Sequence, residues 1–585
     1  MARCRSIALA VLLALAATPV LHARVTIEFD YRYDDGFFTA HPERRAVLEF
    51  AAEYVTRFTD DLSAITVPAP YFWDAAFFRP DKDDTHEIRN LEVRANTLLV
   101  FVGAYDLDTA ELGHAGPGWI GTGFYGSVPW MNNVESRGEA GALEGWQPTD
   151  FGPWGGSVAF DNETDTSWYF GLDTDRLGPD QYDFLSVAIH ELGHVLGLGI
   201  ADSWDTCWDY DDLFYGDAAV DEHGEPVPIH WDYAHWADGT MSHVDGVPQM
   251  ASMTPYINAG ERQLFTDLDF AGLADIGWDV EPRESTWRGA FPGWHYTINW
   301  NTRLVPGVSH TAVFDQGTIC HPLVDDDVGI SRLDLRRAGW TFSGSGRLTV
   351  YFGGIQSAGA GTNTLSVPLT MGSGFACTVA EGNTLALTGG LDADGCALTK
   401  DGPGTLALAA AENLARLDVQ AGTVRLTGAA PLVTRHLAVD TAAGALLDLM
   451  ENNLIVDYDP SPNTHDEVLA AVKSAWASGG WDGSGITCDG DAGTFALGVA
   501  DNADTEFPTR NYLEDETIPV DESSILVRYT LYGNANLDDR VDAADLNKVL
   551  INYGEILADP GDIMPWFLGN FNYDDRVDAA DLNRV

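Results

Sequence analysis

The sequence has 585 residues, which is enough for about three or four domains at the usual ~100–200 residues each. Hydrophobic residues make up 45% of the chain, so it can bury large cores and is not disordered throughout. The formal net charge of −57 argues against nucleic acid and anionic membranes as partners, because both would repel such a surface. It fits divalent cations, high ionic strength or solubility outside the cell.

The first 23 residues predict export. Arg3 and Arg5 give a positive start, residues 7–17 are apolar, and residues 21–23 (Leu-His-Ala) end in a small residue suited to cleavage. This is the three-part form of a secretory signal. No later stretch has the ~18 uninterrupted apolar residues that a membrane span needs. We therefore expect a secreted protein, extracellular or at the cell surface, without a membrane span. Export permits disulfides, but the cysteine spacing does not identify a pair.

Residues 24–282 are rich in aromatic residues and carry most of the histidines. Residues 25–29 alternate like an edge or half-buried strand, and residues 42–61 have the periodicity of a helix. Residues 98–102 and 157–160 are predicted strands, and a long apolar helix begins near Asp183. This alternation of strands and helices predicts an α/β or α+β domain.

From residue 283 to 445 short β-prone runs are separated by Gly, Ser, Thr and Asp. Residues 397–408 and 422–426 predict short strands joined by tight turns, which a β-solenoid and a β-sandwich both satisfy. The first of these runs resembles the β-strand repeat of autotransporter passenger domains. We expect a β-rich accessory region without chemistry. Residues 446–532 combine a predicted helix at 466–476 with a Gly/Asp-rich stretch and a strand at 524–529, and form a mixed connecting region.

The tail, residues 533–585, contains an internal repeat. Residues 533–547 (GNANLDDRVDAADLN) return 36 residues later as residues 569–583 (GNFNYDDRVDAADLN). Calcium loops of the EF-hand type place oxygen ligands at positions 1, 3, 5, 9 and 12, and a backbone carbonyl at position 7. The first copy offers the side chains of Asn534, Asn536, Asp538, Asp542 and Asp545 with the carbonyl of Arg540. The second copy offers the side chains of Asn570, Asn572, Asp574, Asp578 and Asp581 with the carbonyl of Arg576.

Aspartate at position 12 and valine at position 8 of both copies resemble dockerin modules, which carry two such loops. The resemblance implies a small α-helical module, bound Ca²⁺ and a cohesin-like partner. Asparagine at position 1 lowers the ligand charge. Position 6 is Asp539 or Asp575 where glycine is usual, which we expect to strain the turn, and only Arg584 and Val585 follow the second copy. The alternative is an acidic repeat without bound metal.

Residues 190–194, His-Glu-Leu-Gly-His, predict a metal site. Residues four apart share one face of an α-helix, so His190 and His194 can direct two imidazoles at one ion, with Glu191 beside them. Zinc at such a site lowers the pKa of a water molecule to about neutrality, and Glu191 can take the proton of that water. The preceding residues 185–189 are apolar, as a buried active-site helix requires.

This stretch resembles the metzincin metallopeptidases, whose motif H-E-x-x-H-x-x-G-x-x-H/D precedes a methionine turn. Gly197 matches the motif, but the third ligand position is Ile200, which cannot bind zinc. Leishmanolysin-like metzincins supply the third histidine after a long insertion, and this chain looks similar. The resemblance implies His235 as the third zinc ligand and Met253 as an apolar support beneath the site. Competing ligands in the same window are His230, His243, Asp202 and Asp205.

Two further segments are similar to matrix-type metzincins. Thr266 and Asp269 look like a capping box that opens a helix closing the catalytic domain. Residues 155–161 resemble the edge strand that pairs with the substrate backbone. Tyr256, three residues beyond the turn methionine, is either an oxyanion donor or a packed tyrosine.

The sequence therefore predicts a secreted zinc-dependent endopeptidase of protein or peptide substrates, with Glu191 as general base. Its predicted organisation is multidomain: an α/β (α+β) metzincin-like domain at 24–282, the β-rich region at 283–445, the connecting region at 446–532, and the dockerin-like module at 533–585. The alternative is a non-catalytic extracellular adhesin or matrix protein whose protease-like domain has lost its metal, which is consistent with Ile200.

Overall fold

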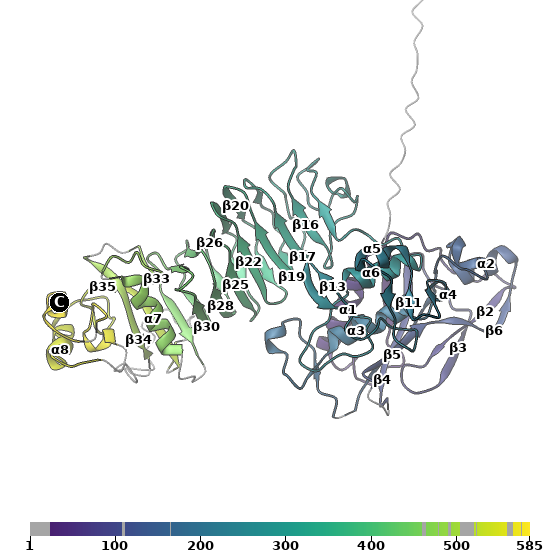
Figure 1. Ribbon diagram of the computed structural model, residues 1–585, viewed down its shortest axis with the longest axis horizontal. Helices are drawn as coiled ribbons and strands as arrows, with labels where there is room; N and C mark the ends of the chain where they lie inside the picture. Colours follow the sequence, from purple (N-terminus) through teal and green to yellow (C-terminus); the bar gives the residue numbers. More distant parts are fainter. Residues whose placement is uncertain are drawn as a thin grey trace, which may run out of the picture.

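Figure 1 shows the computed structural model, an elongated multidomain arrangement that is rich in β-strands and has few helices. The structure describes residues 24–107, 111–163, 165–458, 464–477, 479–489, 493–502, 520–521, 523–557, 565–574 and 576–585. The predicted signal at 1–23 lies outside these ranges. None of the helices within them combines the length and apolar character needed to cross a bilayer.

The N-terminal region, residues 24–282, is built on a four-stranded sheet with strand order β1-β4-β7-β5. The strands are β1 (Thr26–Asp30), β4 (Thr97–Tyr105), β7 (Gly155–Asp161) and β5 (Gly113–Pro117). Helices α1 (Pro42–Val55) and α3 (Phe184–Val195) pack against each other and share one core with β4 and β7. The strands and helices expected at 25–29, 42–61, 98–102, 157–160 and from Asp183 are all present, and α1 ends earlier than expected, at Val55.

The expectation that residues 155–161 form the edge strand is wrong. They form β7, which pairs in parallel with β4 on one side and antiparallel with β5 on the other. Every residue of β7 is buried, so no substrate backbone can pair with it. The antiparallel edge strand of this sheet is β5.

Smaller elements surround this sheet. A second sheet has the order β3-β2-β6, with β2 (Phe72–Phe78), β3 (Thr85–Arg89) and β6 (Trp119–Tyr125). The other helices are α2 (Val128–Ser136), η1 (Ala140–Leu143), η2 (Thr174–Arg176), α4 (Asp202–Asp205), α5 (Asp217–His223) and α6 (Asp267–Asp275). The short strands are β8 (Trp168–Tyr169), β9 (Tyr182–Asp183), β10 (Trp208–Asp209), β11 (Leu213–Phe214), β12 (Val227–Pro228), β13 (Met241–Val244) and β14 (Val247–Met250).

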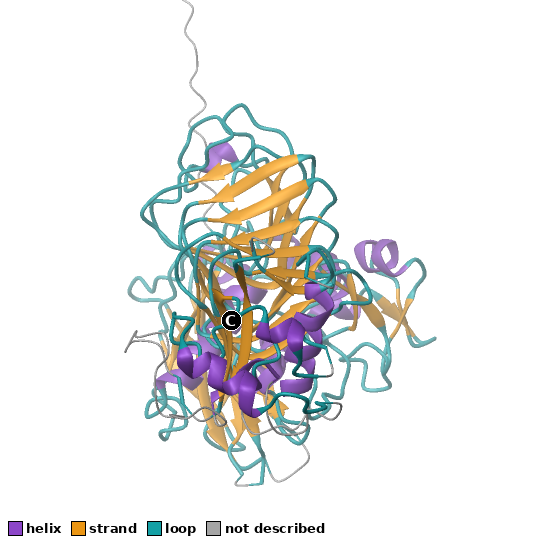
Figure 2. Cartoon of the chain, turned by 90° about the vertical axis from the view of Figure 1, so that its left-hand side faces the viewer, coloured by secondary structure: helices purple, strands orange, loops and turns teal. Residues whose placement is uncertain are grey.

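The region after residue 283 is a β-solenoid of about seven turns. Successive strands of each sheet pair in parallel, rung upon rung, which a sandwich of antiparallel hairpins would not do. Figure 2 shows the stacked strands in orange with loops at the corners. One sheet contains β15 (Glu284–Thr286), β16 (Thr311–Phe314), β17 (Val328–Leu335), β19 (Leu348–Ser357), β22 (Phe375–Val379), β25 (Ala397–Asp401), β28 (Leu414–Val419), β30 (Leu432–Val439) and β32 (Leu454–Asp457).

The second sheet of the solenoid contains β18 (Thr341–Phe342), β20 (Gly361–Leu365), β23 (Asn383–Leu387), β26 (Thr405–Leu408), β29 (Thr423–Leu426), β31 (Leu446–Asp448) and β33 (Gly485–Thr487). Short strands at one corner are β21 (Leu369–Met371), β24 (Leu391–Asp392) and β27 (Ala411–Glu412), and η3 (Thr297–Asn299) lies near the first rung. Alternate side chains of strands such as β23 are buried, because period-2 apolar residues point into the solenoid. The two sheets continue past residue 445, so the change in sequence texture there is not a break in the sheets.

The tail packs on the end of the solenoid. The first sheet ends with the antiparallel strands β35 (Ser524–Leu531) and β34 (Phe495–Asp501), and α7 (Thr464–Trp476) covers β33. The tail helices are α8 (Ala543–Ile551), η5 (Pro565–Leu568) and α9 (Ala579–Leu582). The hydroxyl of Tyr573 donates to the carbonyl of Leu497 over 2.6 Å, and the indole of Trp566 donates to the carbonyl of Asn534 over 2.8 Å. The repeats therefore share a core with the solenoid.

The N-terminal region and the solenoid are in direct contact. Phe50 of α1 packs on Tyr351 of β19 with ring centroids 4.8 Å apart. At the turn between β13 and β14, the carboxylate of Asp245 accepts hydrogen bonds from the hydroxyls of Thr311 and Ser331, at 3.1 and 2.6 Å. The guanidinium of Arg332 donates to the carbonyl of Asp245 over 3.0 Å. Hydrogen bonds and aromatic packing thus hold the two parts together.

We predict that Asp245→Ala destabilises this contact. The Asp245 side chain is 3% exposed, so its removal leaves two buried hydroxyls without their acceptor and costs about 1–3 kcal/mol for each of them. Chemical denaturation of the variant and of the unchanged protein measures this loss. Asp238→Ala, at an exposed position of the same region, is the matched control. Equal stability of Asp245→Ala and the unchanged protein would show that the contact contributes nothing.

Candidate metal centre

Helix α3 carries the His-Glu-Leu-Gly-His motif and is held at its start by a buried ion pair. The carboxylate of Asp183 caps the helix by accepting a hydrogen bond from the backbone N–H of Ser186 over 3.0 Å. Arg262 donates to the same carboxylate over 2.6 Å, and the two side chains are 6% and 0% exposed. Because every residue of α3 is buried, the motif histidines lie inside the molecule.

Two glycines at the end of α3 let the chain turn and let a distant segment approach. Gly197 has a φ of +104° and Gly199 a φ of +74°, in the region that favours glycine. A Cβ on Gly199 would lie 2.1 Å from the carbonyl oxygen of Ala234, so no larger residue fits. Ala234 immediately precedes His235, and this close approach brings His235 beside the helix.

The imidazoles of His190, His194 and His235 converge on one point. One ring nitrogen from each lies within 4.8 Å of the other two. The Nε2 atoms of His194 and His235 are 3.1 Å apart, and the ring centroids of the three pairs are 4.9, 5.2 and 4.9 Å apart. The structure therefore brings together the three histidines that the sequence singles out, although 41 residues separate His194 from His235.

The other nitrogen of each ring is held by a hydrogen-bond acceptor. Nδ1 of His190 lies 2.8 Å from the carbonyl of Ser252, and Nδ1 of His194 lies 2.9 Å from the carbonyl of Leu198. Nδ1 of His235 lies 2.9 Å from the carboxylate of Asp232. An acceptor at Nδ1 places the proton there and leaves the Nε2 lone pair free, which is the usual arrangement of histidine ligands.

The three histidines favour the neutral form. Burial, with a smaller effect of the neighbouring imidazoles, lowers the pKa of His190 and His235 to about 4 and that of His194 to about 3. A neutral imidazole is the form that binds a metal, so no proton has to leave at neutral pH.

Asp269 organises the segments beneath the imidazoles. Its fully buried carboxylate accepts hydrogen bonds from the backbone N–H groups of Ser252 and Met253, at 2.9 and 3.1 Å. It also accepts from the indole of Trp236 over 3.0 Å, and it completes the capping box with Thr266. The expected capping box is thus present. Through Asp269 it joins α6 to the segment of Ser252 and Met253 and to Trp236, the residue after His235.

Met253 lies under α3, as a turn methionine would. The residue is fully buried, and a Cβ on Gly193 would lie 2.6 Å from its sulfur atom. Its carbonyl accepts a hydrogen bond from the backbone N–H of Trp236 over 2.9 Å. Gly193 therefore allows the close packing of this apolar side chain against the helix.

Glu191 lies between α3 and the edge strand β5. Its side chain is buried, and a Cβ on Gly113 of β5 would lie 2.7 Å from its Oε1 atom. Burial, with a smaller effect of Glu111, raises the pKa of Glu191 to about 8. At neutral pH this carboxyl group is therefore mostly protonated, and a cation bound nearby would oppose the shift by favouring the carboxylate.

The competing ligands take other places. His243 is 52% exposed and lies 4.0 Å from Glu222, and Asp202 and Asp205 are exposed. His230 belongs to a second close group with Asp232 and His235. Ile200 is 43% exposed, and Tyr256 is 60% exposed with its ring 6.2 Å from that of His230. Sequence reasoning missed Asp232, although its spacing of three residues before His235 was a usable signal.

A third group of close carboxylates within the described ranges is Asp106, Asp161 and Glu163. Asp106 follows β4, and Asp161 ends β7, so the parallel strands bring their ends together. The sequence reasoning did not single out these residues, because the strand pairing that joins them is not a local pattern.

The two tail repeats have the same loop geometry. The buried Asp545 accepts hydrogen bonds from the backbone N–H groups of Ala535 and Asp542, both at 2.8 Å. Asp581 accepts in the same way from Phe571 and Asp578, at 2.8 and 2.9 Å. The carboxylates at positions 5, 9 and 12 do not form a close group of the kind made by the triad among the described residues.

Position 6 of the first repeat is stabilised by a partner outside the loop. Asp539 has a φ of +68°, a conformation that aspartate tolerates better than most residues. The guanidinium of Arg528 in β35 donates to its carboxylate over 2.8 Å. The aspartate that replaces the usual glycine at position 6 therefore forms an ion pair with a strand of the solenoid sheet. Asp575, at the same position of the second repeat, lies outside the described residues.

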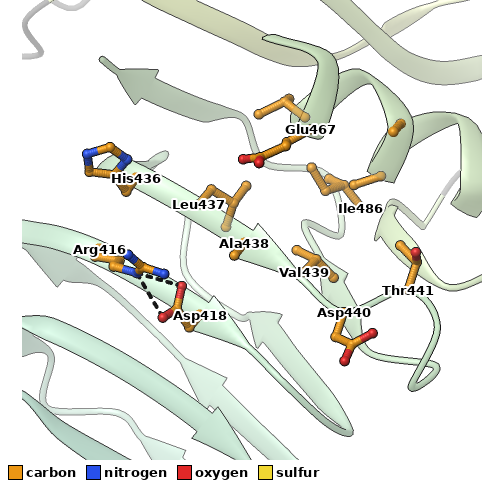
Figure 3. Close-up of a pocket in the computed structure, with 13 residues that line it drawn as sticks. Arg416, Asp418, His436, Leu437, Ala438, Val439, Asp440, Thr441, Glu467 and Ile486 are labelled. Atoms are coloured by element: carbon orange, nitrogen blue, oxygen red, sulfur yellow. Dashed lines mark hydrogen bonds and ion pairs between the residues drawn. The ribbon is translucent and has the colours of Figure 1, made fainter. Parts of the chain in front are cut away.

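A separate cavity of about 620 Å³ lies between β28, β30 and α7 (Figure 3). Arg416 and Asp418 are joined there by two hydrogen bonds of 2.8 Å, and Glu467 extends from α7. None of the three close metal-capable groups in the described part of the chain belongs to this cavity. The triad is therefore the candidate site.

No protein-family model matches the chain, and no similar protein was found among the curated proteins or the solved structures.

If the triad binds zinc, as the sequence predicts, Asp232→Ala lowers the zinc affinity by about 10–100-fold, because His235 loses the acceptor that orients its ring. His235→Ala, which removes a nitrogen donor, should lower it further. Competition with a chromogenic chelator measures both affinities. His243→Ala is the matched control, because this exposed histidine lies outside the triad and should leave the affinity unchanged. Full zinc affinity in His235→Ala would exclude it as a ligand.

Proposed function

We propose that the chain is a secreted zinc-dependent endopeptidase of the metzincin type. One observation supports the proposal above all others: two imidazoles of α3 and a third from a distant segment each present a ring nitrogen to one point, with Glu191 next to the first of them on the same helix. The export signal on which the secreted location rests is a sequence prediction.

The donor set fits zinc. Three neutral nitrogen ligands with a fourth position left for substrate or water are the usual composition of catalytic zinc sites. Hydrogen-bond acceptors at all three Nδ1 atoms hold the rings in place. A zinc ion bound there supplies Lewis-acid chemistry, because it polarises a peptide carbonyl and acidifies a water molecule.

Glu191 supplies the proton transfers. Its carboxylate takes a proton from the attacking water as the carbon–oxygen bond forms at the peptide carbonyl. It then delivers that proton to the amine nitrogen as the carbon–nitrogen bond breaks. Its burial against Gly113 of β5 keeps the carboxyl group away from bulk water, and α3 carries it directly after His190 in the sequence.

The free edge of β5 supports an extended peptide as substrate. β5 is the edge strand of its sheet, and its first residue, Gly113, lies against Glu191. An extended segment can add to an exposed sheet edge through main-chain hydrogen bonds, whatever its side chains. A peptide bound in this way would lie next to Glu191, which supports proteins or peptides as substrates.

A non-catalytic adhesin is the weaker candidate. Its main support is Ile200, which stands at the usual sequence position of the third zinc ligand and cannot bind a metal. This support is weak because His235 lies close to His190 and His194 and can take that role. An adhesin would have no need to keep Glu191 buried against a glycine of β5.

We also propose that the tail repeats bind Ca²⁺. The Oδ1 atom of Asn570, at position 1 of the second loop, is fully buried and has no hydrogen-bond partner among the described residues. Such an orphaned oxygen is expected where a cation completes the site. The ligand chemistry, all oxygen, suits calcium.

The exposed apolar side chains of α8 and the following turn support a cohesin-like partner for the tail. They are Leu546, Leu550, Ile551, Tyr553 and Ile556, with exposed fractions of 37%, 54%, 70%, 51% and 62%. Apolar groups gathered on one exposed element mark interaction surfaces.

The first prediction for this function concerns Glu191→Gln. Loss of the general base should lower kcat for a protein substrate by about 10²–10⁴-fold, because the water is no longer deprotonated. Zinc content should stay at the level of the unchanged protein, since glutamine keeps the shape and the triad is intact. Casein hydrolysis and elemental analysis measure the two quantities. Cleavage at the unchanged rate would rule out the proposed mechanism.

The second prediction concerns calcium and stability. Calcium at 100 times its Kd should stabilise the folded chain by about 2.7 kcal/mol for each occupied repeat, and chelation should remove this gain. The double variant Asp538→Ala/Asp574→Ala should lose the calcium-dependent part of the shift in Tm. Glu451→Ala, at an exposed position outside the repeats, is the control. A shift that persists in the double variant would place the calcium elsewhere.

A further inference from the structure

A cavity of about 490 Å³ lies at the C-terminal end of β5. Its walls include Pro117 at the end of β5, Trp119 at the start of β6, and Ile200 just beyond α3. Trp154, 3% exposed, forms part of the lining. A Cβ on Gly118 would lie 1.9 Å from its indole ring, so the ring packs directly on the backbone there. The cavity thus lies between the edge strand β5 and the end of α3, and its walls are closely packed.

β5 leads from Glu191 to this cavity. Gly113 faces Glu191, and a Cβ on Gly116 would lie 3.5 Å from Cδ1 of Ile200. Three residues of strand span about 10 Å. An extended peptide that pairs antiparallel with β5, the more stable mode of pairing, runs from the cavity toward Glu191. The cavity then receives a side chain about three positions before the cleaved bond.

The lining of the cavity combines apolar walls with negative charge. Its charged residues are Glu135, Asp150 and Asp202, and no lysine, arginine or histidine of the described ranges contributes to it. A lysine or arginine side chain suits such a lining, because its methylene stem packs on apolar surface while its charged head stays near solvent and carboxylates. Trp119, which is 39% exposed, adds an aromatic ring to the lining, and such rings attract a cation over their face. An acidic side chain would be repelled.

We propose that this cavity selects substrates with a lysine or arginine about three residues before the cleaved bond. The proposal rests on the peptidase function proposed above and names its substrate class. Ile200 gains a role in it, because the residue in place of a third metal ligand becomes part of the wall that holds the methylene stem. The strongly acidic composition of the chain adds to the attraction of basic substrates.

The test uses the zinc-loaded full chain and a set of fluorogenic decapeptides that differ at one position before the cleaved bond. Peptides with lysine or arginine there should be cleaved with a kcat/KM about tenfold above that of the leucine peptide, and the glutamate peptide should be the poorest. In Glu135→Lys/Asp202→Lys this order should reverse, with glutamate preferred. Both changed residues are exposed, so the variant should fold.

Asp221→Lys is the matched control, because it changes the charge of the same region at an exposed position outside the cavity. It should keep the preference for basic residues. Cleavage without any basic preference before the bond, or a preference that survives the double charge reversal, overturns the cavity assignment and leaves the peptidase function standing. Failure to cleave any peptide overturns the peptidase function, and the cavity assignment with it.

Discussion

The buried carboxylate of Asp269 is the contact on which the candidate site depends. It accepts hydrogen bonds from Thr266, Ser252, Met253 and Trp236, which belong to three separate segments. Ser252 in turn orients His190, and Trp236 follows His235. Burial raises the pKa of Asp269, and its hydrogen bonds oppose this effect. Removing the carboxylate would leave these donors buried without an acceptor. One side chain thus fixes both the segment that orients His190 and the segment that carries His235.

The solenoid is part of the same body as its neighbours. Its hydrophobic core runs from Trp287 to Val577 and includes side chains of both tail repeats. At the other end, α1 and the β13–β14 turn pack on β19 and on the strands beside it. Bound calcium in the repeats would therefore act on the end of the solenoid itself, while the apolar residues of α8 stay exposed. This arrangement differs from a module on a free tether.

Local patterns predicted the parts of the fold that depend on local chemistry. The capping box at Thr266, the apolar helix before His190 and the short strands after residue 397 follow from spacing alone. Strand order does not follow from local patterns: the glycine-rich sequence of β5 lacks a strand pattern, so nothing local shows that β5, and not β7, is the edge strand. In both a solenoid and a sandwich, apolar residues recur at every second position of a strand. Only the parallel pairing of successive strands, which the structure shows, distinguishes the two folds. Likewise, only the folded chain brings Arg528 to Asp539, and His190 and His194 to His235. Asp232 is different, because it lies only three residues before His235 in the sequence.

The central claim is that His190, His194 and His235 bind one zinc ion through their Nε2 atoms. A crystal structure of the zinc-loaded protein, with anomalous diffraction recorded on both sides of the zinc absorption edge, tests it most directly. The account predicts a single strong peak about 2.0–2.1 Å from all three Nε2 atoms, with a fourth position open toward Glu191. A zinc peak at another group of residues, or one that His235 does not contact, would contradict it.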